Sequence, residues 1–245
     1  MTALDSVCVA STVRAYKATG QGETGGAILS WLTWAERWHA DGVRFFLASQ
    51  RDRHHEADLE MLADLVHSVE GTVWEFSIDE GAESIDNSGR LTGITMGRNL
   101  AHEFAQRDPS ITHLLFLDTD VAPPVDAIER LLEVAERYPS HGLIGGDVPL
   151  YGLSGEQVEG APPHWDLRAH WTSAGFLMVS RAAFRRLRWR WDLEAGCTDD
   201  PAFAEDAIAA GFGVTVVRHS VIGQHFPPNV LYPFQERGHR LSLVD

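Results

Sequence analysis

The sequence predicts an α/β fold in which a mostly parallel central sheet carries helices on both faces. Short apolar runs that are typical of buried strands alternate with segments whose apolar residues recur at helical spacing, which gives the order βαβαβαβα over the first half. The second half breaks this alternation and predicts a mixed arrangement. With 245 residues, 44% of them hydrophobic, the chain can form one large α/β domain or two small ones.

Four strands are expected in the first half, at residues 6–13, 43–49, 72–78 and 114–117. Helices are expected at residues 28–38, ended by Gly42, at 59–66, in a short segment opened by Gly97-Arg98-Asn99, and from Pro124 onward. The polar segments 17–26 and 79–93 are expected to be surface loops. Four strand and helix pairs in this order predict a doubly wound half.

The second half is expected to be less regular. Strands are predicted at residues 143–150, 171–179 and 214–222, and helices at 181–187 and 202–210. Residues 151–169 include Pro162 and Pro163 and predict irregular structure.

Composition narrows the class of protein. The formal net charge of −15 argues against wholesale binding of nucleic acid or anionic membranes. No stretch approaches the apolar length of a membrane helix, and the N-terminus shows no signal-peptide pattern. Only Cys8 and Cys197 are present, so no disulfide framework is expected. These features favour a cytoplasmic protein without a membrane partner.

The strand at 114–117 ends in Asp118-Thr119-Asp120, which is the strongest chemical signal in the chain. The ends of parallel strands are where open α/β sheets bind ligands. Two carboxylates one residue apart suit Mg²⁺ or Mn²⁺, and the phosphates of a substrate complete the coordination. The alternative is a turn rich in aspartate, with Asp120 as a helix cap.

Further motifs accompany this strand in a fixed order. They are Gly97-Arg98-Asn99-Leu100 before it, and Ser173-Ala174-Gly175-Phe176, Thr198 to Phe203 and His225 after it. The series, which spans roughly residues 6–226, resembles the nucleotide-sugar glycosyltransferases of the glycosyltransferase-A fold, most closely family 2. The resemblance implies a single Rossmann-like domain with a nucleotide-sugar-binding half at 1–122, an acceptor and catalytic half at 123–225, and a tail at 226–245.

The resemblance also assigns roles on the donor side. It implies that Asp120 binds the metal, that Asp118 binds the ribose or the metal, and that His225 supplies a third ligand. An ordinary surface histidine is the alternative for His225.

Residues at two other strand ends and before the metal strand complete the expected donor site. Arg98, with Asn99 beside it, is placed to meet the nucleotide or its phosphates. Ser11 and Thr12 are candidates for contact with the base, although they could simply end a strand. Asp52 is a rough counterpart of the family's carboxylate that faces the base.

On the acceptor side, the resemblance makes Asp200 the base that takes the acceptor proton as the sugar inverts. Asp199 stands where the family usually has glutamate, and its charge would raise the pKa of Asp200. The alternative is that one of the two carboxylates caps the helix that follows. Trp171 and Gly175 are candidates to line the acceptor side, and packing is the alternative for Trp171.

The sequence therefore predicts a glycosyltransferase that uses Mn²⁺ or Mg²⁺ and a nucleotide sugar, most readily a UDP-sugar. A nucleotidyltransferase and a non-catalytic nucleotide-sugar-binding domain are the alternatives. Five arginines lie close to aromatic residues between positions 181 and 191, namely Arg181, Arg185, Arg186, Arg188 and Arg190. They make DNA a candidate acceptor, against the alternative of a solvated helix face.

Overall fold

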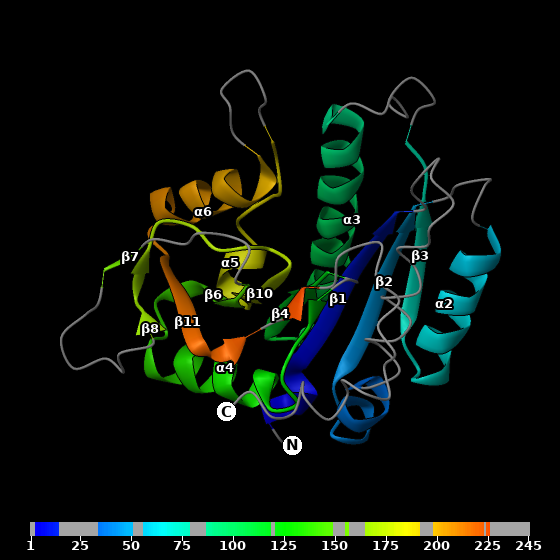
Figure 1. Ribbon diagram of the computed structural model, residues 1–245, viewed down its shortest axis with the longest axis horizontal. Coiled ribbons are helices and arrows are strands. Elements are labelled where there is room, and N and C mark those ends of the chain that lie inside the picture. Colours follow the sequence, from blue (N-terminus) through cyan, green and yellow to red (C-terminus); the bar gives the residue numbers. More distant parts are fainter. Residues whose placement is uncertain are drawn as a thin grey trace.

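The computed structural model describes residues 3–14, 34–50, 56–78, 87–118, 121–148, 155–156, 165–191, 198–222 and 224–225. In this part of the chain one eight-stranded sheet has the order β3-β2-β1-β4-β10-β6-β11-β8, and helices cover both of its faces (Figure 1). The predicted α/β fold, with a mostly parallel sheet and a mixed second half, is confirmed.

The strands of the large sheet are β1 (Val7–Arg14), β2 (Arg44–Gln50), β3 (Thr72–Phe76), β4 (His113–Leu117), β6 (His141–Asp147), β8 (Trp165–Asp166), β10 (Phe176–Ser180) and β11 (Gly213–Ile222). Two short pairs lie apart from it: β5 (Val121–Ala122) with β12 (Gln224–His225), and β7 (Gly155–Glu156) with β9 (Arg168–Ala169).

The helices are η1 (Ala3–Ser6), α2 (Glu56–Ser68), α3 (Asn87–Arg107), α4 (Ala127–Arg137), α5 (Arg181–Phe184) and α6 (Asp199–Ala209), and residues 34–40 form one more. Among the residues described, no helix has the length and apolar character needed to span a membrane.

The strand order reverses at β1. Strands β2 and β3 extend it in parallel on one side, and β4 adds in parallel on the other. Strand β10 then inserts antiparallel between β4 and β6. The carboxyl ends of β1 and β4 therefore flank a topological switch point, where open α/β sheets bind their ligands.

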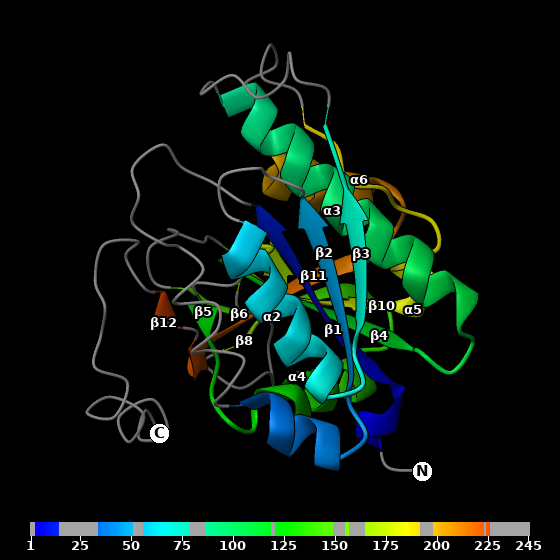
Figure 2. The same ribbon diagram turned by 90° about the vertical axis from the view of Figure 1, so that its right-hand side faces the viewer.

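Alternation along the strands divides the core into two layers. On β4, Leu115 and Leu117 belong to the layer that holds the helix at 34–40, α2 and α4. Leu114 and Phe116 belong to the opposite layer, with α3, α5 and α6 (Figure 2). Each fully buried Leu or Phe contributes roughly 1.5–3 kcal/mol, so strand register is strongly fixed by burial on both faces.

Helix α3 departs most from the expected elements. The predicted loop at 79–93 is wrong where it is described, because the helix begins at Asn87, ten residues before the expected opening at Gly97. The glycine there has a packing reason instead. A Cβ on Gly97 would lie 2.4 Å from Cγ2 of Thr12, so glycine lets α3 approach β1. Gly97 therefore marks a close contact between α3 and β1, and not the start of a helix.

Other boundaries also differ from expectation. Strand β10 begins at Phe176 rather than at residue 171, and β6 ends at Asp147 rather than at residue 150. Helix α4 begins at Ala127 rather than Pro124, and α5 ends at Phe184 rather than at residue 187. Helix α6 begins at Asp199, with Thr198 at the N-cap position. The alternative in which Asp199 or Asp200 caps this helix is therefore wrong. Both carboxylates lie in its first turn, where the helix dipole stabilises negative charge.

Candidate functional site

Asp118 follows β4, and the alternation of that strand determines its direction. Leu114 and Phe116 face the layer of α3 and α6, and Asp118 continues the same alternation. Its backbone N–H donates to the carbonyl of Gly175 at 2.9 Å, which fixes the end of β4 against the segment that leads into β10. The Asp118 carboxylate therefore projects toward α3.

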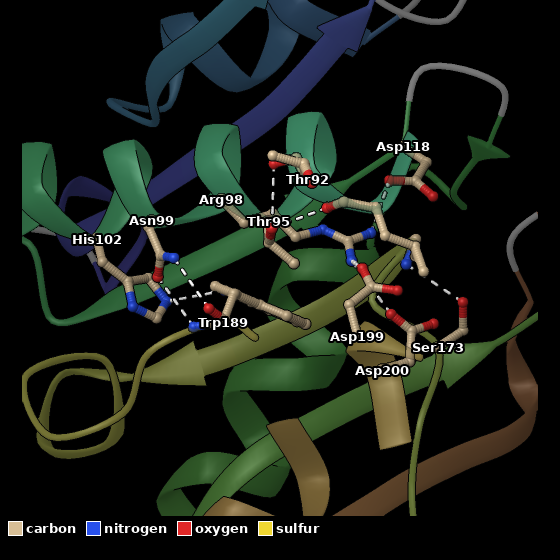
Figure 3. A network of polar contacts seen from close by, with 12 residues as sticks. Thr92, Thr95, Arg98, Asn99, His102, Asp118, Ser173, Trp189, Asp199 and Asp200 are labelled. Atoms are coloured by element: carbon tan, nitrogen blue, oxygen red, sulfur yellow. Dashed lines mark hydrogen bonds and ion pairs between the residues drawn. The ribbon is translucent and has the colours of Figure 1, made fainter. Parts of the chain in front are cut away.

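Arg98 of α3 gathers three carboxylates around its guanidinium (Figure 3). Its Nη2 lies 3.3 Å from Oδ1 of Asp118. Its Nη1 bonds Asp199 and lies 3.1 Å from Oδ1 of Asp200. One side chain thus joins the end of β4 to the first turn of α6, although 80 residues of the sequence lie between Asp118 and Asp199.

Much of this ion network is buried, so its charged groups have lost most of their hydration, which costs free energy. The Arg98 side chain is 5% exposed, that of Asp199 is 10% exposed, and that of Asp118 is 44% exposed. Burial alone would lower the pKa of Arg98, but Asp199, Asp118 and Asp200 raise it above its ordinary value. The guanidinium is thus permanently charged, and its main contacts are the protein's own carboxylates. A contact of Arg98 with the nucleotide stays a prediction.

The pKa of the Asp200 carboxyl lies far above its ordinary value. Burial raises its pKa to about 7; Arg98 opposes the shift, while Asp199 and Asp118 add to it. A backbone hydrogen bond from Ala174 also favours the ionised form. A carboxyl with a pKa near neutrality, beside a strand end that can bind a ligand, has the proton affinity of a general base.

Trp189 lies beneath this network and was not anticipated as part of the site. Its ring is 4.7 Å from the Arg98 guanidinium carbon. The side-chain amide of Asn99 bonds both polar groups of the Trp189 backbone, donating to the carbonyl at 3.0 Å and accepting from the N–H at 2.9 Å. The predicted contact between Asn99 and a nucleotide sugar is untested, and here both polar atoms of its side chain serve Trp189.

The end of β1 lies next to the end of β4, because the two strands pair in parallel. Ser11 is buried and donates its hydroxyl hydrogen to the Leu117 carbonyl at 2.7 Å. Thr12 packs against Gly97 of α3. Both residues therefore support the junction of β1, β4 and α3, and contact with a base stays a prediction for them.

Gly175 occupies a position where the site needs space. A Cβ there would lie 2.8 Å from Oδ2 of Asp118. Gly175 thus lies against the Asp118 carboxylate, and its place on the acceptor side stays a prediction.

Gly175→Ala is expected to displace the Asp118 carboxylate and to weaken binding of a metal–nucleotide complex by roughly tenfold, while the melting temperature changes little. Calorimetric titration with UDP and Mn²⁺ would measure the effect. Gly211→Ala is a control for binding alone: nothing lies within 4 Å of the added methyl, and the φ of +87° means that its cost falls on stability. Equal affinities in wild type and Gly175→Ala would contradict this account.

Of the three predicted metal ligands, Asp118 is described in full, Asp120 lies outside the described residues, and of His225 only the backbone is described. Asp52, the candidate for facing the base, also lies outside the described residues. That backbone is informative, because β12 pairs with β5 and sets His225 opposite Val121, the residue after Asp120. Among the described residues, no cluster of three or more His, Cys, Asp or Glu could hold a metal.

The remaining candidates are mainly structural. Trp171 is partly buried and packs against the layer of α3 and α6. Arg181 donates to three backbone carbonyls, Arg188 to two, and Arg190 pairs with Asp206. The register of β10 against β4 puts Ser180 opposite His113, so α5 starts at the end of β4 remote from Asp118. The start of the arginine cluster thus lies away from the site.

Comparison with known proteins places the fold. No protein-family model matches the chain, and no curated protein matches it in sequence. Among solved structures, S. aureus TarS 1-349 is similar with a TM-score of 0.56 and 10% identity, over 97% of this chain and 64% of that chain. The inositol-1-phosphate CTP transferase from T. maritima is similar with a TM-score of 0.53 and 14% identity, over 96% of both chains. The chain therefore has the same α/β fold as these two structures, in agreement with the predicted glycosyltransferase-A-like fold.

Proposed function

We propose that this chain is a metal-dependent glycosyltransferase that moves a sugar from a nucleotide sugar to an acceptor hydroxyl with inversion. The observation that carries the proposal is the Arg98 network, which joins Asp118 at the end of β4 to Asp200 in α6. It brings a carboxylate suited to the donor within one side chain of a carboxyl whose pKa is about 7. Such a pairing supports transfer to a hydroxyl, which needs a base close to the donor.

In this reaction Asp200 accepts the proton of the acceptor hydroxyl. The hydroxyl oxygen forms a bond to the anomeric carbon of the sugar while the bond from that carbon to the diphosphate breaks. The nucleoside diphosphate leaves with the electron pair, and the proton remains on Asp200 until it passes to solvent. Asp199 and Arg98 hold the Asp200 carboxylate in place during this step.

The metal we propose is Mn²⁺ or Mg²⁺, held by Asp118, Asp120 and His225. Carboxylate oxygens fit either ion, and the pairing of β12 with β5 supports the inclusion of His225 by bringing its backbone next to residue 121. When bound, the ion would stabilise negative charge on the leaving diphosphate as a Lewis acid.

The donor we favour is a UDP-sugar, and the acceptor is a molecule with a free hydroxyl group. A hydroxylated base in DNA is a candidate acceptor because of the arginines at 181–190, but most of them already bond protein carbonyls or Asp206. A donor screen that measures nucleotide release, run with small hydroxyl acceptors and with DNA, would separate these acceptors.

A nucleotidyltransferase is the second candidate, and the match to the T. maritima CTP transferase over 96% of both chains favours it. The segment after β1 argues against it, because Gly20 to Gly26 contains no basic residue to hold a triphosphate. The same donor screen distinguishes the two classes. A glycosyltransferase releases a nucleoside diphosphate from a nucleotide sugar, whereas a nucleotidyltransferase releases pyrophosphate from a nucleoside triphosphate.

Asp120→Ala is expected to abolish Mn²⁺-dependent binding of UDP while the melting temperature stays within a few degrees of wild type. The reason is that few protein ligands hold such a cation, so the removal of one carboxylate abolishes most of the protein's affinity for it. Calorimetric titration of UDP with and without Mn²⁺ measures the effect. Asp126→Ala, which removes a half-exposed carboxylate paired with Arg130, is the control. Unchanged UDP affinity in Asp120→Ala would contradict the assignment of Asp120 as a metal ligand.

A further inference from the structure

The indole ring of Trp189 packs against Arg98, the residue that joins the three carboxylates. One face of the ring stacks on Phe203 of α6 at 3.8 Å between centroids and an interplanar angle of 9°. Phe116 of β4 meets it edge-on at 5.3 Å. The Arg98 guanidinium lies 4.7 Å from the ring centroid. Trp189 is 3% exposed, so it contacts the site's charged groups without reaching a substrate.

Helix α3 fixes this ring through two of its own side chains. Asn99 binds the Trp189 backbone on both sides of the residue. His102 lies 3.2 Å from the indole Nε1 through its Nε2, and 3.3 Å from the Leu187 carbonyl through its Nδ1. Figure 3 shows both side chains directed at Trp189 from the same helix that carries Arg98.

These contacts define a single state for His102. A carbonyl can only accept, so Nδ1 carries the hydrogen, and Nε2 is left to accept from the indole N–H. Burial lowers the pKa of His102 to about 3, so the ring stays neutral. Arg98 and His102 are four residues apart on α3 and thus lie on one face of it. The guanidinium and the group that orients its aromatic partner therefore share one rigid support.

We propose that Trp189 is a positioning residue of the reaction proposed above, and that Asn99 and His102 fix it from α3. The ring holds the Arg98 guanidinium between Asp118 on one side and Asp199 and Asp200 on the other. Because Trp189 stacks on Phe203, it also holds α6, which carries the base, against α3. The inference rests on the proposed function for its catalytic consequence, but not for its structural content.

A second tryptophan in the chain offers a matched control. Arg107 lies 4.7 Å from the ring centroid of Trp74, the same distance as in the Arg98–Trp189 pair. Trp74 belongs to β3 at the far edge of the sheet and also packs on two aromatic rings, Phe46 and Phe104. Trp74→Leu therefore removes an arginine–indole contact of the same length without touching the carboxylate network.

The experiment compares Trp189→Leu with Trp74→Leu in two ways. The first readout is the ¹⁵N NMR spectrum of the arginine side chains, in which a clamped guanidinium gives separate, slowly exchanging Nη signals. The second is steady-state turnover with the donor found in the screen. Trp189→Leu should free the Arg98 signals and reduce kcat by roughly tenfold, the scale of a desolvated cation–π contact, with donor KM changed less than about threefold.

Trp74→Leu should leave the Arg98 signals and kcat unchanged, whatever stability it loses. Trp189→Phe keeps an aromatic face and should restore most of the turnover. If Trp189→Leu does not fold, Asn99→Ala, which removes the two backbone bonds alone, should loosen the Arg98 signals in the same way. Unchanged Arg98 signals, or equal kcat losses in the two leucine variants, would overturn the inference. If the wild type turns over no nucleotide sugar, the proposed function fails while the NMR comparison still decides the positioning role.

Discussion

Replacing Asp200 by asparagine is expected to reduce turnover by roughly 10²–10⁴-fold, the usual contribution of a positioned base. Asparagine keeps the size of the side chain but cannot accept the acceptor proton. Because Asp200 is not the N-cap of α6, the substitution leaves the helix start intact. Donor affinity, measured by calorimetry with UDP and Mn²⁺, should change little. Near wild-type turnover in Asp200→Asn would place the base elsewhere.

The same substitution is expected to stabilise the protein above neutral pH. The pKa of Asp200 is about 7 in the folded protein and roughly 3.9 in an unfolded chain. The folded state therefore binds the proton more tightly, and this group's contribution to stability is lost as pH rises between those two values. Asparagine is neutral at every pH, so it avoids that loss.

Thermal melts across pH measure this effect. At pH 8 we expect Asp200→Asn to be more stable than wild type by on the order of 1–3 kcal/mol, allowing for its weaker bond to Arg98. For a chain of this size, each kcal/mol corresponds to roughly 2–4 °C in melting temperature. Below about pH 4 the gain should vanish. If the stability difference between Asp200→Asn and wild type is less favourable to the variant at pH 8 than at pH 5, the raised pKa of Asp200 is contradicted.

Asp199→Asn provides the paired control for Asp200→Asn, because both carboxylates bond Nη1 of Arg98 from the first turn of α6. Turnover at high pH should fall much less in this variant. Asp199 raises the pKa of Asp200, so its neutralisation should move the acidic limb of the pH–rate profile to lower pH. If Asp199→Asn is instead the inactive variant, the roles of the two carboxylates are exchanged.

The elements that the sequence predicted well are those with a local signal. Strands β1, β2, β4 and β11 are apolar runs that stay buried on both faces, and their expected ranges agree with the structure to within a residue or two. The start of α3 gave no such signal, because Gly93 and Gly97 lower its helix propensity and resemble a loop. Contact with β1, which is not visible locally, decides that segment.

In the site, too, residues with a local sequence signal could be predicted, and contacts between distant elements could not. The aspartate pairs at 118 and 200 could be found from the sequence, because each sits at the end of an element with a recognisable pattern. Their junction through Arg98 could not, since a buried ion network depends on how α3, β4 and α6 pack together. Trp189 lies within the arginine-rich stretch at 181–191, and only the structure shows its contacts with Asn99 and His102.

Replacing Arg98 by methionine is expected to be the most damaging single change to the fold. Methionine fills much of the volume but removes the guanidinium that Asp118, Asp199 and Asp200 share, and the side chains of Asp199 and Asp200 are largely buried. Removing one partner of a buried ion pair costs about 3–5 kcal/mol, because an uncompensated charge remains. Arg98→Lys keeps the charge but cannot reach both sides with a planar fork, so it should recover only part of the loss.

Chemical denaturation of both variants from pH 5 to pH 8 would test this. Without the guanidinium, the pKa of Asp200 should rise further, since its burial and the repulsion from the other two carboxylates are no longer opposed. The folded Arg98→Met protein would then hold protons that its unfolded chain releases, so its stability should increase as pH falls toward 5. Adding Asp199→Asn should restore part of the stability at pH 8, because it removes the carboxylate that Arg98 bonds most closely. A loss in Arg98→Met that is independent of pH, and unrelieved by Asp199→Asn, would mean that the arginine acts through packing rather than charge.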